Sequence, residues 1–243
     1  MIAFEYPLNE KIRSYLRFES LFLQIKKSKD LTTENDSIAF FKALFELLEL
    51  SERCDIRHDL VKDLRQLSEQ MNSWLALPEV DYQAVSKLII EINELIDAVL
   101  NMPKQLRYFK TNRFLTSLKQ RFSIPSGCCN FDLPQFHFWL ASDLEKRQQD
   151  SQRWFSYFVS LDLALALFLK IKRSQGVSSE LKASNGVYQG EVENCSFLII
   201  KLEQKQAVYP MISGHKNRYS IRFVDAEVDN QLSENIVFEQ ICC

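Results

Sequence analysis

The chain has 243 residues, a formal net charge of -2 and a hydrophobic content of 46%. This length is enough for one large domain or two modest ones, each with a buried core. Five glycines and six prolines are too few for long flexible linkers or extended disorder.

Helical spacing of apolar residues dominates the first half of the chain. Residues 1–8 favour a short strand, and Asn9 is expected to cap the helix that follows. The further helices expected in this half cover 36–50, 55–75, 81–100 (capped by Asp81) and a region from Pro103 to before Pro125 that breaks near Asn112.

Turn-forming residues mark the centre of the chain. The segment 124–134 (IPSGCCNFDLP) is predicted to be extended, and a short helix at 135–140 and a long one at 143–172 follow it. Beyond Arg173 we expect a loop and then strands rich in β-branched and aromatic residues, at 186–189, 195–202, 207–212, 217–224 and 235–241.

Helices first and strands last indicate an α+β fold. The helical domain is expected over 9–123 and 135–175. A mostly antiparallel β domain would be assembled from N-terminal, central and C-terminal segments, at 1–8, 124–134 and 176–243. The β domain is thus predicted to be discontinuous in sequence.

Motifs of catalysis and metal binding are missing from the sequence. It holds no Walker A loop, no G-x-G-x-x-G, no G-x-S-x-G and no C-x-x-C, and its three histidines stand apart. We therefore expect no enzyme, no metal and no cofactor, with a nucleophilic Cys54 or Cys129 as the enzymatic alternative. Because the N-terminus does not resemble a signal peptide, the cysteines are expected to be reduced and to pack as small apolar side chains. No apolar run approaches the ~20 residues of a membrane span.

Basic residues gather in two spans that contain no acid. The first lies between Asp97 and Asp132, and the second between Glu203 and Asp225. In a chain that is acidic as a whole, such spans indicate a bounded positive surface. Their basic residues are Lys104, Arg107, Lys110, Arg113, Lys119 and Arg121 in the first span and Lys205, Lys216, Arg218 and Arg222 in the second.

Strand alternation separates charge from core in the segment 217–224. Arg218 and Arg222 would point to one side, and Tyr219 and Phe223 to the other, into the core. The two arginines would lie roughly 13 Å apart, which suits two acids on a peptide better than one small anion. Arginines on a solvent-facing strand also occur without any binding role, as protection of a sheet edge.

Two further arginine pairs have helical spacing. Arg13 and Arg17, and again Arg53 and Arg57, are four residues apart and would share a helix face. Nucleic acid is one possible partner of such charge, yet the strand aromatics face the core and the chain is not basic. An acidic protein segment fits better, because arginine binds carboxylates with two parallel hydrogen bonds.

Three blocks of the sequence resemble the ZapD family of bacterial cell-division proteins. They are FEYPLNEKIRSYLR at 4–17, FSIPSGCCNFDLPQFHFWL at 122–140, and YPMISGHKNRYSIRF at 209–223 together with the final ICC. The resemblance implies a cytoplasmic homodimer at the division site that binds the C-terminal peptide of FtsZ, the tubulin-like division GTPase. It further implies that the dimer crosslinks and bundles FtsZ filaments and so supports the midcell Z-ring and septation.

The resemblance also implies which basic residues bind FtsZ. They stand in or beside the matching blocks, or at weaker matches: Arg13, Arg17, Arg53, Arg57, Arg113, His137, Lys216, Arg218 and Arg222. GTP would be bound by FtsZ and not by this chain, and neither nucleic acid nor membrane insertion is expected. The alternative function is a nucleic-acid-binding regulator that uses the same basic surface.

Overall fold

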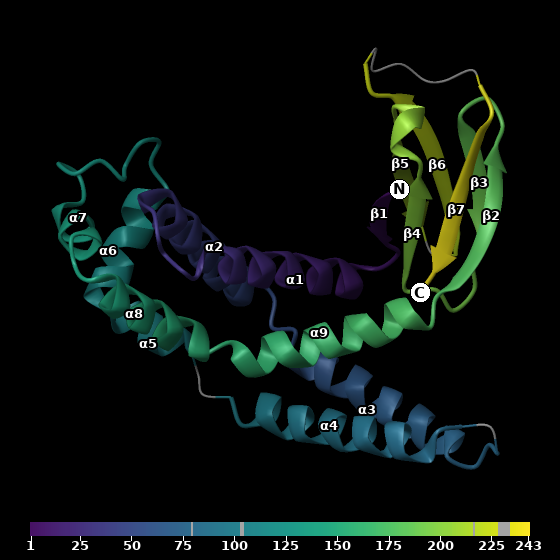
Figure 1. The fold of residues 1–243 in the computed structure, drawn as a ribbon, viewed down its shortest axis with the longest axis horizontal. Coiled ribbons are helices and arrows are strands. Elements are labelled where there is room, and N and C mark those ends of the chain that lie inside the picture. The colour runs from purple at the N-terminus through teal and green to yellow at the C-terminus, as the bar shows by residue number, and fades with distance from the viewer. Residues whose placement is uncertain (79, 103–104, 216, 228–233) are drawn as a thin grey trace. The chain divides into compact units, whose positions relative to one another are not determined.

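The computed structural model describes residues 1–78, 80–102, 105–215, 217–227 and 234–243 (Figure 1). The chain forms two compact units, one made of Met1–Leu16 and Phe168–Cys243 and the other of Arg17–Leu167. We refer to them as the β unit and the helical unit. The boundary between the units lies within the first and last helices, α1 (Glu10–Ser28) and α9 (Val159–Ser174).

Some of the helices begin where a polar side chain accepts a hydrogen bond from one of their first backbone amides. Asn9 Oδ1 accepts from the N–H of Ile12, and Asp81 Oδ1 from that of Ala84, so both predicted caps are confirmed. The helices between α1 and α9 are α2 (Glu34–Arg53), α3 (Arg57–Trp74), α4 (Tyr82–Leu100), α5 (Gln105–Thr111), α6 (Arg113–Phe122), α7 (Pro134–Leu140) and α8 (Leu144–Ser156).

The core of the helical unit is aromatic and centres on Phe41 of α2, which is fully buried. Seven aromatic rings have centroids between 5.2 and 6.1 Å from that of Phe41. They belong to α2, α6, α7 and α8, so one side chain ties these helices together. The rings are those of Phe40, Phe45, Phe114, Phe122, Phe136, Trp139 and Trp154.

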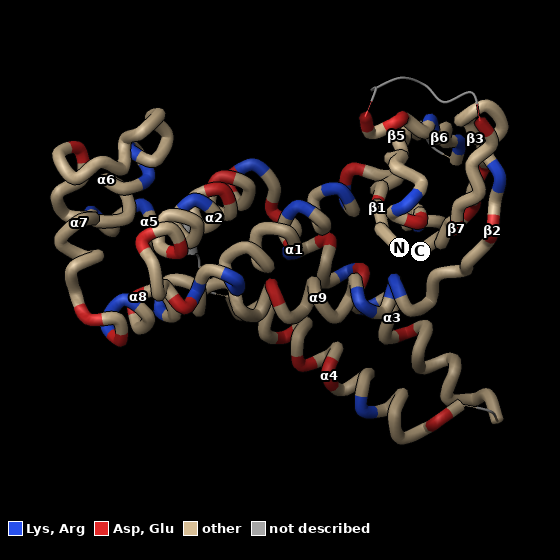
Figure 2. The backbone as a smooth tube through the Cα atoms, turned by 45° about the horizontal axis from the view of Figure 1, so that its top comes forward, with Lys and Arg blue, Asp and Glu red and all other residues tan. Residues whose placement is uncertain are grey.

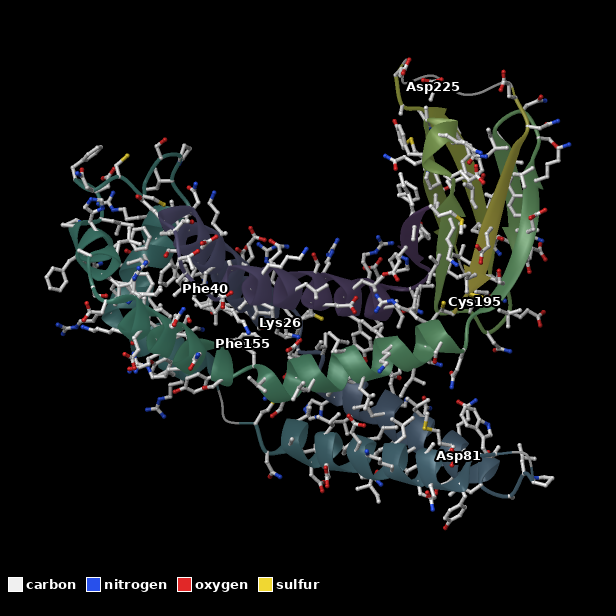
Figure 3. The ribbon with its side chains drawn as sticks, in the orientation of Figure 1. Lys26, Phe40, Asp81, Phe155, Cys195 and Asp225 are labelled. Carbon is white, nitrogen blue, oxygen red and sulfur yellow. A yellow bond between two sulfur atoms is a disulfide. The ribbon has the colours of Figure 1, made fainter. Side chains whose placement is uncertain are left out.

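A partly buried ion pair joins α1 to α9 within the helical unit, and Figure 3 labels its lysine, Lys26. Lys26 Nζ lies 2.7 Å from Oδ1 and 2.6 Å from Oδ2 of Asp162, whose side chain is almost fully buried. Burial raises the pKa of Asp162, and the ammonium group of Lys26 opposes that rise. Lys26 thus compensates a carboxylate that is otherwise costly to bury.

The β unit consists of two antiparallel sheets with a shared apolar core. One has the strand order β1-β4-β7-β2 and the other β3-β6-β5. Leu198, Phe238, Ile221 and Phe223 represent the core side chains of the two sheets. The strands are β1 (Ile2–Pro7), β2 (Val177–Ala183), β3 (Val187–Glu191), β4 (Phe197–Leu202), β5 (Val208–His215), β6 (Arg218–Asp225) and β7 (Ile236–Cys242), with a short 3-10 helix η1 (Gln204–Gln206).

The predicted α+β class is confirmed, as are the N-terminal strand and the five C-terminal strands. Strand β1 pairs with β4 along its whole length, from Ile2 opposite Leu202 to Pro7 opposite Phe197. A loop was expected beyond Arg173, where the structure has strand β2, whose sequence VSSELKA is polar and mostly exposed. It forms a strand because it is an edge that pairs with β7.

Two other segments differ from their predicted form. The expected long helix at 143–172 is broken near Tyr157, and α8 and α9 meet at 66°. The segment 124–134 was expected to extend the β domain, but it forms consecutive turns and lies in the helical unit. Local hydrogen bonds, such as that from the N–H of Gly127 to the carbonyl of Ile124, replace sheet pairing there.

The sulfur chemistry also departs from the prediction of reduced thiols. Cys195 and Cys242 form a disulfide, with Cα atoms 5.6 Å apart. The pairing of β4 with β7 brings them together, because Leu198 lies opposite Cys242. Cys128, Cys129 and Cys243 are thiols, and burial raises the pKa values of Cys128 and Cys243.

Replacing Lys26 by methionine is expected to lower the free energy of unfolding by about 2–3 kcal/mol at pH 7. This is less than the ~3–5 kcal/mol for breaking a fully buried pair, because water reaches part of Lys26. A raised carboxyl pKa in the folded state favours folding at low pH and disfavours it as the pH rises. The loss should therefore shrink when urea unfolding is measured at pH 4.5.

The double variant Lys26→Met/Asp162→Asn is the control, since it removes the buried charge altogether. It should recover part of the lost stability at pH 7 and show no such pH dependence. An equal loss at both pH values for the single variant would mean that Asp162 is not the cause.

Candidate functional site

Strand β6 carries charge on one side and core residues on the other. Tyr219, Ile221 and Phe223 are buried, whereas Arg218 and Arg222 are exposed. The predicted alternation is confirmed. The two arginines therefore share one solvent-facing side of the sheet. Figure 2 marks in blue the described Lys and Arg positions along the backbone of the chain.

Tyr219 attaches β6 to the opposite sheet through a buried hydrogen bond. Its hydroxyl donates a hydrogen bond to Oε1 of Gln240 in β7, on the opposite sheet. Its ring crosses Gly190 of β3 so closely that a Cβ there would lie 2.4 Å from the hydroxyl oxygen. Burial raises the pKa of Tyr219 to about 12, so this donor keeps its proton at neutral pH.

A shallow hollow of about 650 Å³ lies on the three-stranded sheet beside Arg218. Arg218 Nε donates to Oε1 of Glu191 at 2.7 Å, and both side chains are largely exposed. Hydroxyl groups from β5 and β6 add neutral hydrogen-bonding groups. The hollow is lined by Gln189, Gly190, Glu191, Ser213, Gly214, Arg218, Tyr219 and Ser220.

Arg222 has a different environment. Its guanidinium lies 3.9 Å from the sulfur of Met211. It makes no ion pair with any residue that the structure describes, so its charge faces solvent. Lys216, which the sequence assigns to the same surface, lies outside the described residues, as does Lys104 of the first basic span.

Arg13 is another predicted site residue of the β unit. Its Nε lies 3.1 Å from Oε1 of Glu10, and its guanidinium carbon lies 5.9 Å from the centre of the Tyr6 ring. The ring and the carboxylate hold the side chain in place. Arg17, although four residues further along α1, belongs to the helical unit.

The structure brings Arg17 and Arg53 together in the helical unit. Both line a hollow of about 340 Å³ between α1 and α2, together with Glu46 and Glu49. Arg53 forms an ion pair with Glu49 one helical turn earlier. The two arginines thus share this surface with acids of the same chain.

Arg57 makes a two-point contact with Asp55. Nε lies 2.8 Å from Oδ1 and the terminal nitrogen 2.5 Å from Oδ2, and these bonds lower the pKa of Asp55. Arg57 also lines a hollow of about 470 Å³ with Arg107 and Lys110. Its apolar wall includes Phe18, Ile56 and Leu161. Arg107 and Lys110 belong to the first acid-free basic span, which indicated a positive surface here. The search for arginine pairs at helical spacing did not find them.

Arg113 and His137 are both exposed, on α6 and α7. Arg113 follows Asn112, the cap of α6, and has no ion pair among the residues that the structure covers. Other members of the basic span are paired. Lys110 and Lys119 lie 3.3 and 3.9 Å from the carboxylate of Glu52.

These local pairs leave the basic groups available to a partner. An exposed ion pair contributes only about 0–1 kcal/mol, because water competes for both charges. A carboxylate from a second molecule can therefore replace Glu191 or Glu49 at little cost.

Metal binding and membrane insertion were also considered for the described residues. They contain no group of three or more His, Cys, Asp or Glu side chains that could hold a metal ion. Within the same ranges, a single helix long and apolar enough for a membrane span is not found. Only the bent pair α8 and α9, taken together, meets that test of length and composition.

The fold and this surface define a two-unit α+β protein whose described residues carry exposed cationic groups without a metal cluster. The family model "ZapD: Cell division protein" matches residues 16–222. The cell division protein ZapD of Vibrio cholerae serotype O1 (strain ATCC 39541 / Classical Ogawa 395 / O395) is 36% identical over 241 residues, which cover 99% of this chain and 98% of that protein. ZapD of Aliivibrio fischeri (strain ATCC 700601 / ES114) is 38% identical over 243 residues, 100% of this chain and 98% of that protein. The chain therefore belongs to the ZapD family of cell division proteins.

Removing the hydroxyl of Tyr219 in a Tyr219→Phe variant is expected to cost about 1–3 kcal/mol of unfolding free energy, because Gln240 keeps a buried acceptor without a donor. Wild-type stability should also fall between pH 10 and 12, where the unfolded tyrosine ionises and the folded one does not. That part of the decline should be missing from the variant in urea unfolding.

Tyr82→Phe is the matched control, because this tyrosine is 64% exposed. It should change stability by less than about 0.5 kcal/mol. Equal effects of the two substitutions would argue against the bond to Gln240.

Proposed function

We propose that this protein binds the C-terminal peptide of FtsZ through its basic residues and, as a homodimer, crosslinks and bundles FtsZ filaments. It would act in the cytoplasm, at the midcell Z-ring, and support Z-ring assembly. The observation that carries the proposal is the exposure of Arg218 and Arg222 on one side of a strand whose other side is locked into the core.

The spacing of the two arginines supports a peptide partner. They lie on one strand, roughly 13 Å apart by strand geometry, too far for one small anion to bridge. An extended acidic segment can reach both, with Ser213 and Ser220 on the lining of the hollow beside Arg218 as additional hydrogen-bonding groups. Guanidinium groups suit this role, because each can bind a carboxylate with two parallel bonds.

The helical unit supplies further cationic positions for the same partner. Arg17 and Arg53 share one hollow, and Arg57 and Arg107 share another that has an apolar wall. Arg113, His137, Arg13 and Lys216 complete the proposed set. No cofactor is required, because binding and crosslinking involve no chemical step.

Crosslinking follows from the number of sites. A peptide held by a few exposed charge-assisted bonds binds weakly, and salt weakens it further. A dimer carries two such sites, and a filament repeats the peptide many times, so avidity replaces single-site affinity.

A nucleic-acid partner is less well supported. Tyr219 and Phe223, the aromatics between the strand arginines, are buried and cannot stack on bases. Binding of random duplex or single-stranded DNA at physiological salt in a gel shift would favour that alternative over FtsZ.

The double variant Arg218→Glu/Arg222→Glu is expected to reduce the pelleting of FtsZ bundles at least about 10-fold, because attraction at two contacts becomes repulsion. The affinity for a synthetic FtsZ C-terminal peptide should fall in parallel. The melting temperature should be unchanged, since both side chains are exposed.

A matched control is Lys170→Glu/Lys182→Glu, which makes the same change of charge at exposed positions of the same unit outside both basic spans. It should bundle filaments like the wild type. If bundling survives in the arginine variant, or is lost equally in the lysine variant, the strand arginines are not the binding residues.

A further inference from the structure

Two cysteines of the β unit lie far apart in the sequence and meet at one end of the larger sheet. Cys195 precedes β4 and Cys242 ends β7, with a sequence separation of 47, and their Cα atoms are 5.6 Å apart (Figure 3, where Cys195 is labelled). This distance lies within the ~4.4–6.8 Å that a disulfide spans. The protein is proposed to act in the cytoplasm, where glutathione keeps thiols reduced and a disulfide is usually transient or redox-sensing.

The fold brings the two cysteines together without help from the bond between them. Strands β4 and β7 pair from Leu198 opposite Cys242 to Lys201 opposite Glu239, and Lys201 Nζ lies 3.1 Å from Oε1 of Glu239. Both cysteines pack at the margin of an apolar core whose buried members are alanine, leucine, isoleucine, phenylalanine and tyrosine side chains. The thiol form is therefore expected to fold as well, so the pair can exist in both states.

Small redox reagents can reach the pair. Both cysteines are only partly buried, and Cys195 lies in the turn between β3 and β4, directly after Asn194 with a φ of 56°. On the other side of Cys195, the N–H of Ser196 donates to the carbonyl of Cys243 at 2.6 Å and anchors the backbone. Access to a sulfur atom is what exchange with a dissolved thiol requires, because a thiolate must attack it.

The adjacent Cys243 is a poorer candidate for oxidation. Burial raises the pKa of its thiol, and Glu5 raises that pKa further. Its side chain also fits closely against Gly176, where a Cβ would lie 2.9 Å from its Sγ. Because the thiolate is the reactive form of cysteine, Cys243 is expected to remain a thiol when the other two react.

The pair lies close to the hydrogen bond that holds β6. Gln240 and Cys242 are two residues apart on β7 and share its core-facing side, and Gln240 accepts the bond from the Tyr219 hydroxyl. The loop that the disulfide closes contains β4, β5, β6 and most of β7. Closing a loop of this length restricts the unfolded chain, which stabilises the folded β unit and not the helical unit.

We propose that Cys195 and Cys242 form a reversible redox site, which hydrogen peroxide oxidises to the disulfide and glutathione reduces, and which sets the stability of the β unit. The inference goes beyond the proposed function and does not depend on the binding of FtsZ.

The chemistry of the site is balanced in both directions. In oxidation, one thiolate attacks an oxygen of the peroxide, the O–O bond breaks and a sulfenic acid forms. The second thiolate attacks the sulfenic sulfur, so that two thiols and one hydrogen peroxide give one disulfide and two waters. In reduction, one glutathione forms a mixed disulfide with the protein and a second releases it, which leaves two protein thiols and glutathione disulfide.

The first measurement counts thiols in the wild-type chain, reduced with dithiothreitol or treated with hydrogen peroxide. Each sample is unfolded in guanidinium chloride with iodoacetamide and weighed by intact mass spectrometry. The peroxide sample should carry two fewer alkylated cysteines. Incubation of the folded, oxidised protein with excess glutathione should restore both.

The second measurement compares amide hydrogen exchange in the two wild-type forms. The slowest amides of β4, β6 and β7 should exchange at least about 30-fold more slowly in the oxidised form, because the disulfide makes unfolding of the β unit less favourable. Exchange in α2 of the helical unit should be equal in the two forms.

The third measurement uses two variants that differ by one position. Cys242→Ser should form no disulfide within the chain in peroxide. The matched control Cys243→Ser, changed at the adjacent residue, should form it and gain the same protection as wild type. Cys128→Ser/Cys129→Ser, which removes thiols of the helical unit, should also behave like wild type.

The proposal is overturned if wild type keeps both thiols in peroxide, or if Cys242→Ser forms a disulfide as readily as wild type, since the reaction would then lie elsewhere in the chain. It is also overturned if glutathione reduces the bond only after unfolding, because the bond would then be a permanent structural link. Equal exchange rates of the two wild-type forms would remove the link to the stability of the β unit and overturn it as well.

Discussion

Phe41 lies where four helices of the helical unit converge, and seven aromatic rings surround it. This packing constrains everything at that end of the unit. It fixes α7 through Phe136 and Trp139, and so fixes which side chains of α7 remain outside. The exposed Phe138 and His137 are consequences of that constraint. The side chains on the surface of α7 are therefore those that do not pack in the core.

In the β unit, core packing also decides which side chains are exposed, but here the buried positions recur every second residue. Alternate residues of β6 enter the core, and the bond from Tyr219 to Gln240 ties the strand to the opposite sheet. The arginines in between have only solvent to face. Their contacts with the rest of the chain are few and exposed, which suits reversible binding of a partner. Strand β6 thus combines a backbone that is fixed by the core with arginines whose ion pairs are few and exposed.

The alternation on β6 and the caps Asn9 and Asp81 could be predicted, because each depends on local spacing. The place of the N-terminal strand in the C-terminal sheet was predicted from the order of helices and strands along the chain. Strand β2 was missed because it is polar and forms through its pairing with β7. The segment 124–134 was misassigned because its turn-forming residues are held by local hydrogen bonds and not by sheet pairing. Likewise, local patterns could not indicate that Glu191 pairs with Arg218, 27 residues away, or that Arg17 and Arg53 share a hollow.

The strand order of the larger sheet has a consequence for the synthesis of the protein. Strand β7 (Ile236–Cys242) follows the other strands in the sequence, yet it lies between β4 and β2 in the interior of the sheet. The four-stranded sheet therefore cannot be completed until residues 236–242 have been synthesised. The helical unit is continuous from Arg17 to Leu167 and can fold while synthesis proceeds. A chain that stops before residue 236 would therefore have a folded helical unit attached to a sheet that lacks one of its two interior strands, with open edges prone to aggregation.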